Sequence, residues 1–146
     1  MENKTLMTDF YELTMAQTYF NEGKKDEQVY FDLFFRKNPF DGGYTISGGL
    51  DETIKYIKNF KFGGEEIDYL RSLGKFSEEF LDYLANLKFE GDIYAIPDGT
   101  VVFPNEPVLT VKADAVATYA QDARKNYVDA AYLLMEQQGI QLVKKR

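Results

Sequence analysis

The pattern of apolar and polar residues predicts a helix near the start of the chain, between Asp9 and Gly23. Two apolar stripes follow the helical period: the first holds Phe10, Leu13, Ala16 or Gln17, and Phe20, and the second holds Tyr11, Met15 and Tyr19. Asp9 is a candidate N-cap with Glu12 three residues later, and Gly23 stands where a glycine commonly ends a helix. Because two sides are apolar, we expect this helix to be buried by two partners, or by its own domain and another subunit.

From Gln28 the pattern changes to alternation, which predicts a strand. One side of this strand carries Val29, Phe31, Leu33 and Phe35, and the other carries Tyr30, Asp32, Phe34 and Arg36. Pro39 should end the strand, because proline donates no hydrogen bond to a ladder. A turn at residues 41–43 and a short returning strand at residues 44–47 are expected next.

Three short helices are expected between residues 51 and 87, where apolar residues recur at helical spacing. Asp51 is the candidate cap of the first helix. Gly74 should close the second, and Ser77 should cap the third. This part of the chain should therefore form a compact helical cluster.

Strands are predicted at residues 92–96, 100–103 and 108–111, separated by turns at residues 97–99 and 104–107. Asp114 is a candidate cap for a long helix that Gly139 would end. The expected fold class is α+β: a small antiparallel sheet packed with several short helices and a C-terminal helix.

Composition restricts the function. A chain of 146 residues normally forms one domain, and 45% hydrophobic residues are enough for a packed core. The net charge of −7 argues against nucleic-acid binding, because an acidic surface repels phosphate backbones. No apolar run approaches the length of a membrane span, and the first residues do not resemble a secretory signal. A cytoplasmic protein is the simplest interpretation.

The sequence has no cysteine and no histidine, which removes disulfides, thiolate metal sites and histidine-based catalysis. We find no convincing metal-ligand cluster and no catalytic residue. Arg36 and Lys37 are candidates for phosphate or carboxylate binding, although an ion pair of Arg36 with Asp32 or Asp41 is the favoured interpretation. The remaining candidates are interpreted as structural: the glycine pairs 42–43 and 48–49 as turns, the carboxylate pairs 65–66 and 78–79 as helix starts, and Asp98 as a turn residue.

Three blocks in order resemble the nicotinate phosphoribosyltransferase family. TDFYELTMAQTYF is similar to its TD-x-Y-x-LTM opening, and FDLFFRKNPFDGGYTISGGL is similar to its second block. KFEGDIYAIPDGTVVFPNEPVLTVKA is similar to the third, in which the family places Glu at the position of Asp98. The resemblance covers about residues 6–113. It implies an N-terminal α/β domain of the type II phosphoribosyltransferase kind.

Residues 1–113 are therefore expected to form the family's N-terminal domain, and residues 114–146 a helical tail that does not match the family. The family's catalytic barrel and the histidine that it phosphorylates are missing from this sequence, so we expect a truncated protein. The resemblance implies that the complete enzyme converts nicotinate, phosphoribosyl pyrophosphate and ATP into nicotinate mononucleotide in NAD salvage. ATP and Mg²⁺ belong to that enzyme, and no cofactor is expected on this chain alone.

The resemblance also implies a site shared across a dimer, in which the first helix helps to line the partner's nicotinate site. Tyr11 would stack on or flank the nicotinate ring. Asp9 would hold the start of the helix by capping or by a salt link, and Arg36 would lie near the anionic groups. The expected partners are nicotinate and a second copy of the chain or a barrel-bearing subunit.

Other interpretations remain open. On the sequence alone, a core or dimer-interface aromatic is the favoured interpretation of Tyr11, and the family resemblance shifts the preference to the binding role. The third block also resembles the hammerhead of biotinyl and lipoyl carriers, but the tip of its hairpin, residues 97–99, has no lysine for attachment. The chain as a whole is alternatively a non-catalytic binding or assembly module, a homo-oligomer, or an inactive gene fragment.

Overall fold

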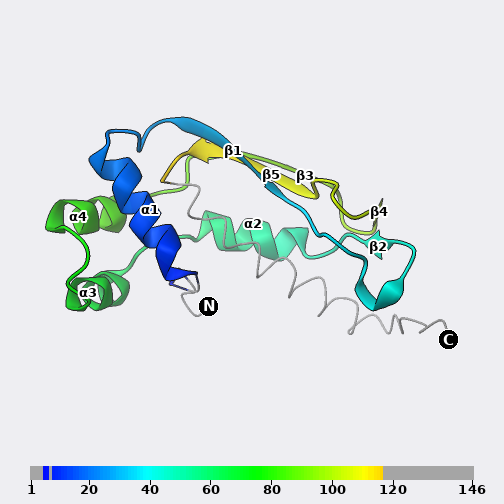
Figure 1. Ribbon diagram of the computed structural model, residues 1–146, viewed down its shortest axis with the longest axis horizontal. Helices are drawn as coiled ribbons and strands as arrows, with labels where there is room; N and C mark the ends of the chain where they lie inside the picture. Colours follow the sequence, from blue (N-terminus) through cyan, green and yellow to red (C-terminus); the bar gives the residue numbers. More distant parts are fainter. Residues whose placement is uncertain (1–4, 7, 117–146) are drawn as a thin grey trace.

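A computed structural model describes residues 5, 6 and 8–116, and in these residues it has four α-helices and two small antiparallel sheets (Figure 1). The α+β class is therefore confirmed. The predicted C-terminal helix lies outside the described residues. In chain order the elements are α1 (Phe10–Asn21), β1 (Gln28–Leu33), the 3-10 helix η1 (Pro39–Asp41), β2 (Thr45–Ile46), α2 (Leu50–Lys58), α3 (Gly64–Ser72), α4 (Glu78–Asn86), β3 (Gly91–Ala95), β4 (Val101–Val102) and β5 (Leu109–Asp114).

The larger sheet has the order β1-β5-β3, so its central strand comes last in the sequence. Ala113 of β5 pairs with Val29 of β1 on one side and with Gly91 of β3 on the other. Along β5, buried Leu109, Val111 and Ala113 alternate with partly exposed residues, as period two requires. In Figure 1 this sheet lies above α2, while α1, α3 and α4 gather at one end.

The predicted helix cap at Asp114 is wrong, because Asp114 is the last residue of β5. It pairs with Gln28, and the next N–H, that of Ala115, donates to Glu27 O at 2.8 Å. The strand is thus longer than the alternation suggested, since both neighbouring strands supply partners for it.

The helix starts show one correct cap and one wrong one. The Ser77 hydroxyl accepts a hydrogen bond from Phe80 N at 3.2 Å and caps α4, as predicted. The predicted cap at Asp51 is wrong, because α2 begins at Leu50, two residues earlier than a cap at Asp51 would require. Its N-cap is Gly49, in the left-handed region at φ 90°, and Asp98 Oδ1 accepts from Leu50 N at 3.1 Å. A residue of the 97–99 turn therefore caps a helix that is distant in sequence.

The main core lies between α1, the α3–α4 pair and the inner face of the larger sheet. Its fully buried centre is Phe80, Leu81 and Leu84 of α4, with Leu13 and Ala16 packing onto it from α1. Aromatic rings continue this contact in a row, with centroid distances of 5.8, 5.9, 5.6 and 5.1 Å along the series Phe10, Phe76, Phe80, Phe20 and Tyr83. Such ring pairs stabilise the packing of α1 on α4 beyond the contribution of the apolar area that they bury.

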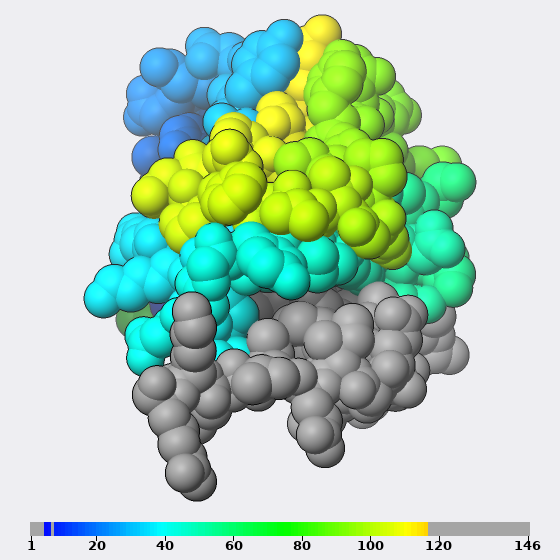
Figure 2. Space-filling view, turned by 90° about the vertical axis from the view of Figure 1, so that its right-hand side faces the viewer, coloured from blue at the N-terminus to red at the C-terminus, as the bar shows by residue number. Residues whose placement is uncertain are grey.

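The smaller sheet pairs β2 with β4 and closes the opposite end of the molecule, which Figure 2 views directly. Ser47 N donates to Thr100 O, and Gly99 N donates to Ser47 O, both at 2.8 Å. Many of the large apolar side chains of this end are exposed. We call them the end patch: Phe34, Phe40, Tyr44, Val101 and Phe103. Phe40 and Asp41 have φ of 58° and 53°, a conformation that costs non-glycine residues about 1 kcal/mol each.

Candidate functional site

Tyr11 lies in the first turn of α1 with its ring 58% exposed. The buried side of the same helix is formed by Leu13 and Ala16, whereas Met15, one turn after Tyr11, is also exposed. Phe20 of the first predicted stripe also packs against the core, whereas Phe10 is half exposed. In the second stripe Tyr19 packs against the core, and Tyr11 and Met15 point outward, where a ligand or a partner has access to them.

Asp9 is the N-cap of α1, but its side chain makes no capping hydrogen bond. The backbone carbonyl of Asp9 accepts from Glu12 N at 3.0 Å, while the Glu12 carboxylate accepts from the Thr8 hydroxyl. The expected capping role of the Asp9 side chain is therefore wrong, although Asp9 does occupy the N-cap position. The Asp9 carboxylate is exposed beside the positive end of the helix dipole.

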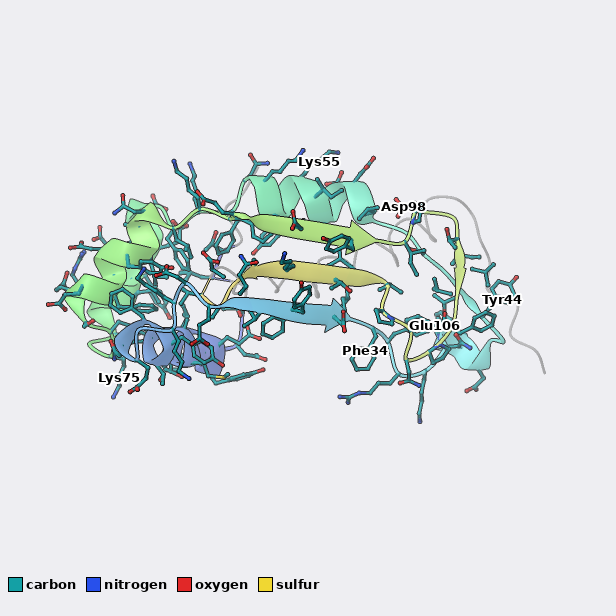
Figure 3. All side chains as sticks on the ribbon, turned by 90° about the horizontal axis from the view of Figure 1, so that it is seen from above. Phe34, Tyr44, Lys55, Lys75, Asp98 and Glu106 are labelled. Atoms are coloured by element: carbon teal, nitrogen blue, oxygen red, sulfur yellow. The ribbon has the colours of Figure 1, made fainter. Side chains whose placement is uncertain are left out.

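Arg36 is exposed in the bend that follows β1, two residues after Phe34, which Figure 3 marks at the end of the strand away from α1. Within the described part of the chain it has no ion pair with Asp32 or Asp41, so the favoured interpretation is wrong. The Asp32 carboxylate instead accepts from the Thr110 hydroxyl across the sheet. The structure does not bring Arg36 into contact with Tyr11.

The backbone beside Arg36 is fixed by the turn at residues 103–107. Phe35 O accepts from Asn105 N, and Leu33 O accepts from Val108 N, both at 2.8 Å. Asn105 adopts φ 67°, and the Glu106 carboxylate accepts from Phe103 N at 3.0 Å. The sequence indicated a turn here but gave no sign that it would support the arginine.

The other candidates are structural, as expected from the sequence. Glu66 Oε2 accepts from Gly63 N at 2.9 Å at the start of α3, and Glu78 pairs with Arg71 at 3.0 Å. Gly42 closes a backbone turn to Pro39 O at 3.1 Å, and Gly49 is the N-cap of α2. These residues shape the fold, which leaves the surface around Tyr11 and the separate surface around Arg36 as candidate binding regions.

Gln17 is a residue of α1 whose connection the sequence did not reveal. Its Nε2 donates to Lys75 O at 3.3 Å, and its Oε1 accepts from Ser77 N at 2.8 Å. The hydrophobic pattern left this position undecided between the apolar stripe and the polar side. A side-chain amide that bonds two backbone groups in a distant loop has no signature in local periodicity.

One surface hollow of about 370 Å³ lies away from the predicted site residues. It is lined by Tyr83, Asn86, Leu87, Lys88, Glu90 and Asp114. Burial, followed by the carboxylates of Asp26 and Asp114, raises the pKa of Tyr83 above its usual value. Across residues 5, 6 and 8–116, no three carboxylates gather closely enough to hold a metal ion. No helix in the same residues is long and apolar enough to cross a membrane.

Comparison with known proteins identifies the chain's relatives. The family model for the nicotinate phosphoribosyltransferase N-terminal domain matches residues 6–123. A nicotinate phosphoribosyltransferase of Mycobacterium tuberculosis is 44% identical over 111 residues, covering 76% of this chain and 24% of the relative. One from Bacillus subtilis is 37% identical over 134 residues, covering 91% of this chain and 27% of the relative. The chain therefore spans about a quarter of the curated relatives that it matches.

The crystal structure of human nicotinic acid phosphoribosyltransferase superposes with a TM-score of 0.73 at 26% identity, covering 85% of this chain and 25% of the human chain. A nicotinate-nucleotide pyrophosphorylase from Pyrococcus furiosus shares the fold, with a TM-score of 0.56 at 18% identity. The family match and the Bacillus alignment both extend past residue 113. The domain boundary expected at that residue stays a prediction.

Proposed function

Because this chain belongs to the nicotinate phosphoribosyltransferase family, we propose that it is the N-terminal part of an enzyme that makes nicotinate mononucleotide in NAD salvage. The substrates of that reaction are nicotinate, phosphoribosyl pyrophosphate and ATP, so it combines glycosyl transfer with ligation. The family match over residues 6–123 carries this proposal. The present residues supply binding groups, and the reacting centre belongs to a barrel contributed by further polypeptide.

In this proposal Tyr11 flanks the nicotinate ring of a site on the partner subunit of a dimer. Its exposed position on a helix that is packed firmly on α4 supports that role, because an aromatic ring held on a rigid element stacks at low entropic cost. Arg36 supplies a forked cation that can bind a carboxylate or a phosphate. Its guanidinium is available for this role because it has no ion pair within the described residues. Asp9 fixes the start of α1 through its backbone carbonyl.

ATP and Mg²⁺ are assigned to the complete enzyme. The residues described here do not offer a metal-ligand set, so no step is assigned to a metal on this part of the chain. The cytoplasm is the proposed location, in keeping with a cysteine-free chain.

Calorimetric titration of the chain with nicotinate tests the role of Tyr11. We expect weak binding that Tyr11→Phe retains and that Tyr11→Ala reduces by about tenfold, because stacking is worth about 0.5–1.5 kcal/mol beyond the area buried. Tyr69→Ala is the matched control, since that ring is 55% exposed on α3. Equal loss in Tyr11→Ala and Tyr69→Ala would contradict the assignment. Formation of nicotinate mononucleotide by the purified chain alone would contradict the proposal that further polypeptide contributes the reacting centre.

The second candidate function is a non-catalytic assembly module. The exposed end patch and the exposed Tyr11 and Met15 support it, because several large apolar side chains exposed at one end of a small domain are typical of an interaction site. Light scattering during size-exclusion chromatography tests this alternative. A homo-oligomer supports it, and a monomer at all accessible concentrations contradicts it.

A further inference from the structure

Gln17 links α1 to the loop that precedes α4 through two directional hydrogen bonds. Its amide donates to Lys75 O at 3.3 Å and accepts from Ser77 N at 2.8 Å, so both of its polar atoms are used. Ser77 is itself the N-cap of α4, because its hydroxyl accepts from Phe80 N. One side chain of α1 therefore bonds the residue that defines where α4 begins.

These bonds differ in kind from the other contacts of α1. Leu13 and Ala16 pack in the core through apolar surface, and the rings of Phe10 and Phe20 contact those of Phe76 and Phe80, but apolar contact itself is non-directional. The hydroxyls of Thr14 and Thr18 bond carbonyls within α1 itself. Gln17 instead reaches another element, and the geometry required for a hydrogen bond limits rotation of α1 about its axis.

The rotation of α1 decides where the Tyr11 ring lies. A side chain extends about 5–6 Å from a helix axis, so a turn of about 10° moves its end by about 1 Å. Misplacement by about 1 Å costs up to about 100-fold in reactions that depend on orientation. We propose that Gln17 is a positioning residue that sets the place of Tyr11 by locking α1 to the N-cap of α4. Only one part of this inference rests on the proposed function: the expectation that nicotinate binding depends on the position of Tyr11.

The test is fluorine NMR of the chain labelled with 3-fluorotyrosine, in which Tyr11→Phe identifies the Tyr11 resonance. In Gln17→Ala we expect this resonance to shift and broaden, while the resonances of Tyr44 and Tyr94 on distant elements stay in place. Gln17→Glu keeps an oxygen that accepts from Ser77 N and removes the donor to Lys75 O. It should therefore move the Tyr11 resonance in the same direction by a smaller amount, and it serves as the informative variant if Gln17→Ala does not fold.

Asn86→Ala is the matched control, because Asn86 is an exposed amide whose Nδ2 donates to Asp82 O within its own helix. It should leave the Tyr11 resonance unchanged. An unchanged Tyr11 resonance in both Gln17 variants would overturn the proposal, even if amide exchange in α4 accelerates, because Gln17 would then serve only the stability of the loop.

Titration with nicotinate adds a second readout. The dissociation constant of Gln17→Ala should rise about tenfold, while that of Asn86→Ala stays at the wild-type value. If wild-type chain does not bind nicotinate, the proposed role of Tyr11 fails, and the fluorine signal still decides whether Gln17 positions the ring. If nicotinate binds and the Gln17 variants bind it as well as wild type, the positioning role fails alone.

Discussion

Tyr83 combines packing and charge at the edge of the core. Its ring contacts Phe20 at 5.1 Å between centroids, and Lys25 Nζ lies 5.5 Å from the centroid of the same ring. Partial burial is the main cause of its raised pKa, with smaller contributions from Asp26 and Asp114. The folded protein therefore favours the neutral phenol.

This raised pKa predicts a loss of stability in alkali. The contribution of the neutral Tyr83 is fully present below the unfolded pKa of about 10 and is lost as the pH rises through the higher folded value. The free energy of unfolding of wild type minus that of Tyr83→Phe should therefore begin to fall near pH 10 and keep falling as the pH rises through the folded pKa, as measured by urea titrations. Tyr94→Phe, at an exposed position, corrects for the general effect of alkali. A difference that is independent of pH would disprove the linkage.

At the level of elements, the pairing of β3 with β5 depends on Gly91, because glycine has no β-carbon. A β-carbon built there would lie 2.5 Å from Lys112 O and 2.7 Å from the Ala113 β-carbon. Both neighbours belong to the central strand, which β1 holds from its other side. The backbone of β5 therefore has little freedom to give way.

Gly91→Ala should lower the free energy of unfolding by about 1–3 kcal/mol, the usual cost of overpacking, as measured by urea denaturation. Gly43→Ala is the control, because its added β-carbon would meet no atom within 4 Å. We expect that variant to change stability by less than about 0.5 kcal/mol. Equal effects at the two glycines would contradict the close approach of β3 to β5.

The start of α2 depends on Asp98, which belongs to another element. Asp98→Ala removes the acceptor for Leu50 N and should cost about 1 kcal/mol, as loss of an N-cap does. Asp98→Asn retains an acceptor oxygen and should cost less. Hydrogen exchange of the first turn of α2 measures the effect. Unchanged protection in Asp98→Ala would show that Gly49 alone sets this helix start.

The elements divide into those that local sequence determines and those that it does not. The starts and ends of α1 and α4 were predictable, because Gly23, Ser77 and the apolar period act within a few residues. The extension of β5 to Asp114 and the role of that residue were not, because the β1 partners of residues 112–114 lie more than 80 residues away. The cap that Asp98 supplies to α2 failed to appear in the sequence for the same reason.

The same distinction between local and distant determinants applies to the candidate site. Of the second apolar stripe of α1, Tyr11 and Met15 are exposed while Tyr19 packs against the core, so burial of the exposed part by a second partner stays a prediction. The ion pair expected for Arg36 was wrong, because Asp32 lies on the sheet face where the Thr110 hydroxyl is nearer. Strand register decides which neighbouring group the Asp32 carboxylate bonds. Register is in turn set by the pairing of strands across the sheet.

On the scale of the whole molecule, the described residues expose large apolar side chains on α1 and at the end patch, which lie at opposite ends (Figure 1), and also at Tyr30 and Tyr94 of the larger sheet. The proposed dimer uses the α1 region. Met15→Lys places a charge beside Tyr11 and should raise the dissociation constant for self-association by at least about tenfold, since desolvating an unpaired charge is costly. Sedimentation velocity over a range of concentrations measures this.

The control for this prediction is Tyr94→Lys, which makes the same change in net charge on the outer face of the sheet, where Tyr94 is 57% exposed. It should leave self-association as in wild type. If both lysine variants weaken self-association equally, net charge rather than the α1 surface determines it.

The position of β5 as the central strand has a consequence for synthesis on the ribosome. β1 and β3 flank β5, and both emerge from the exit tunnel before their common neighbour does. At about 5–20 residues per second, the roughly 75 residues between β1 and β5 take several seconds to emerge. During that interval β1, joined by β3 in its last part, offers an unsatisfied amide edge to other chains, so shielding of the growing polypeptide by a ribosome-bound chaperone would matter most until Asp114 has emerged.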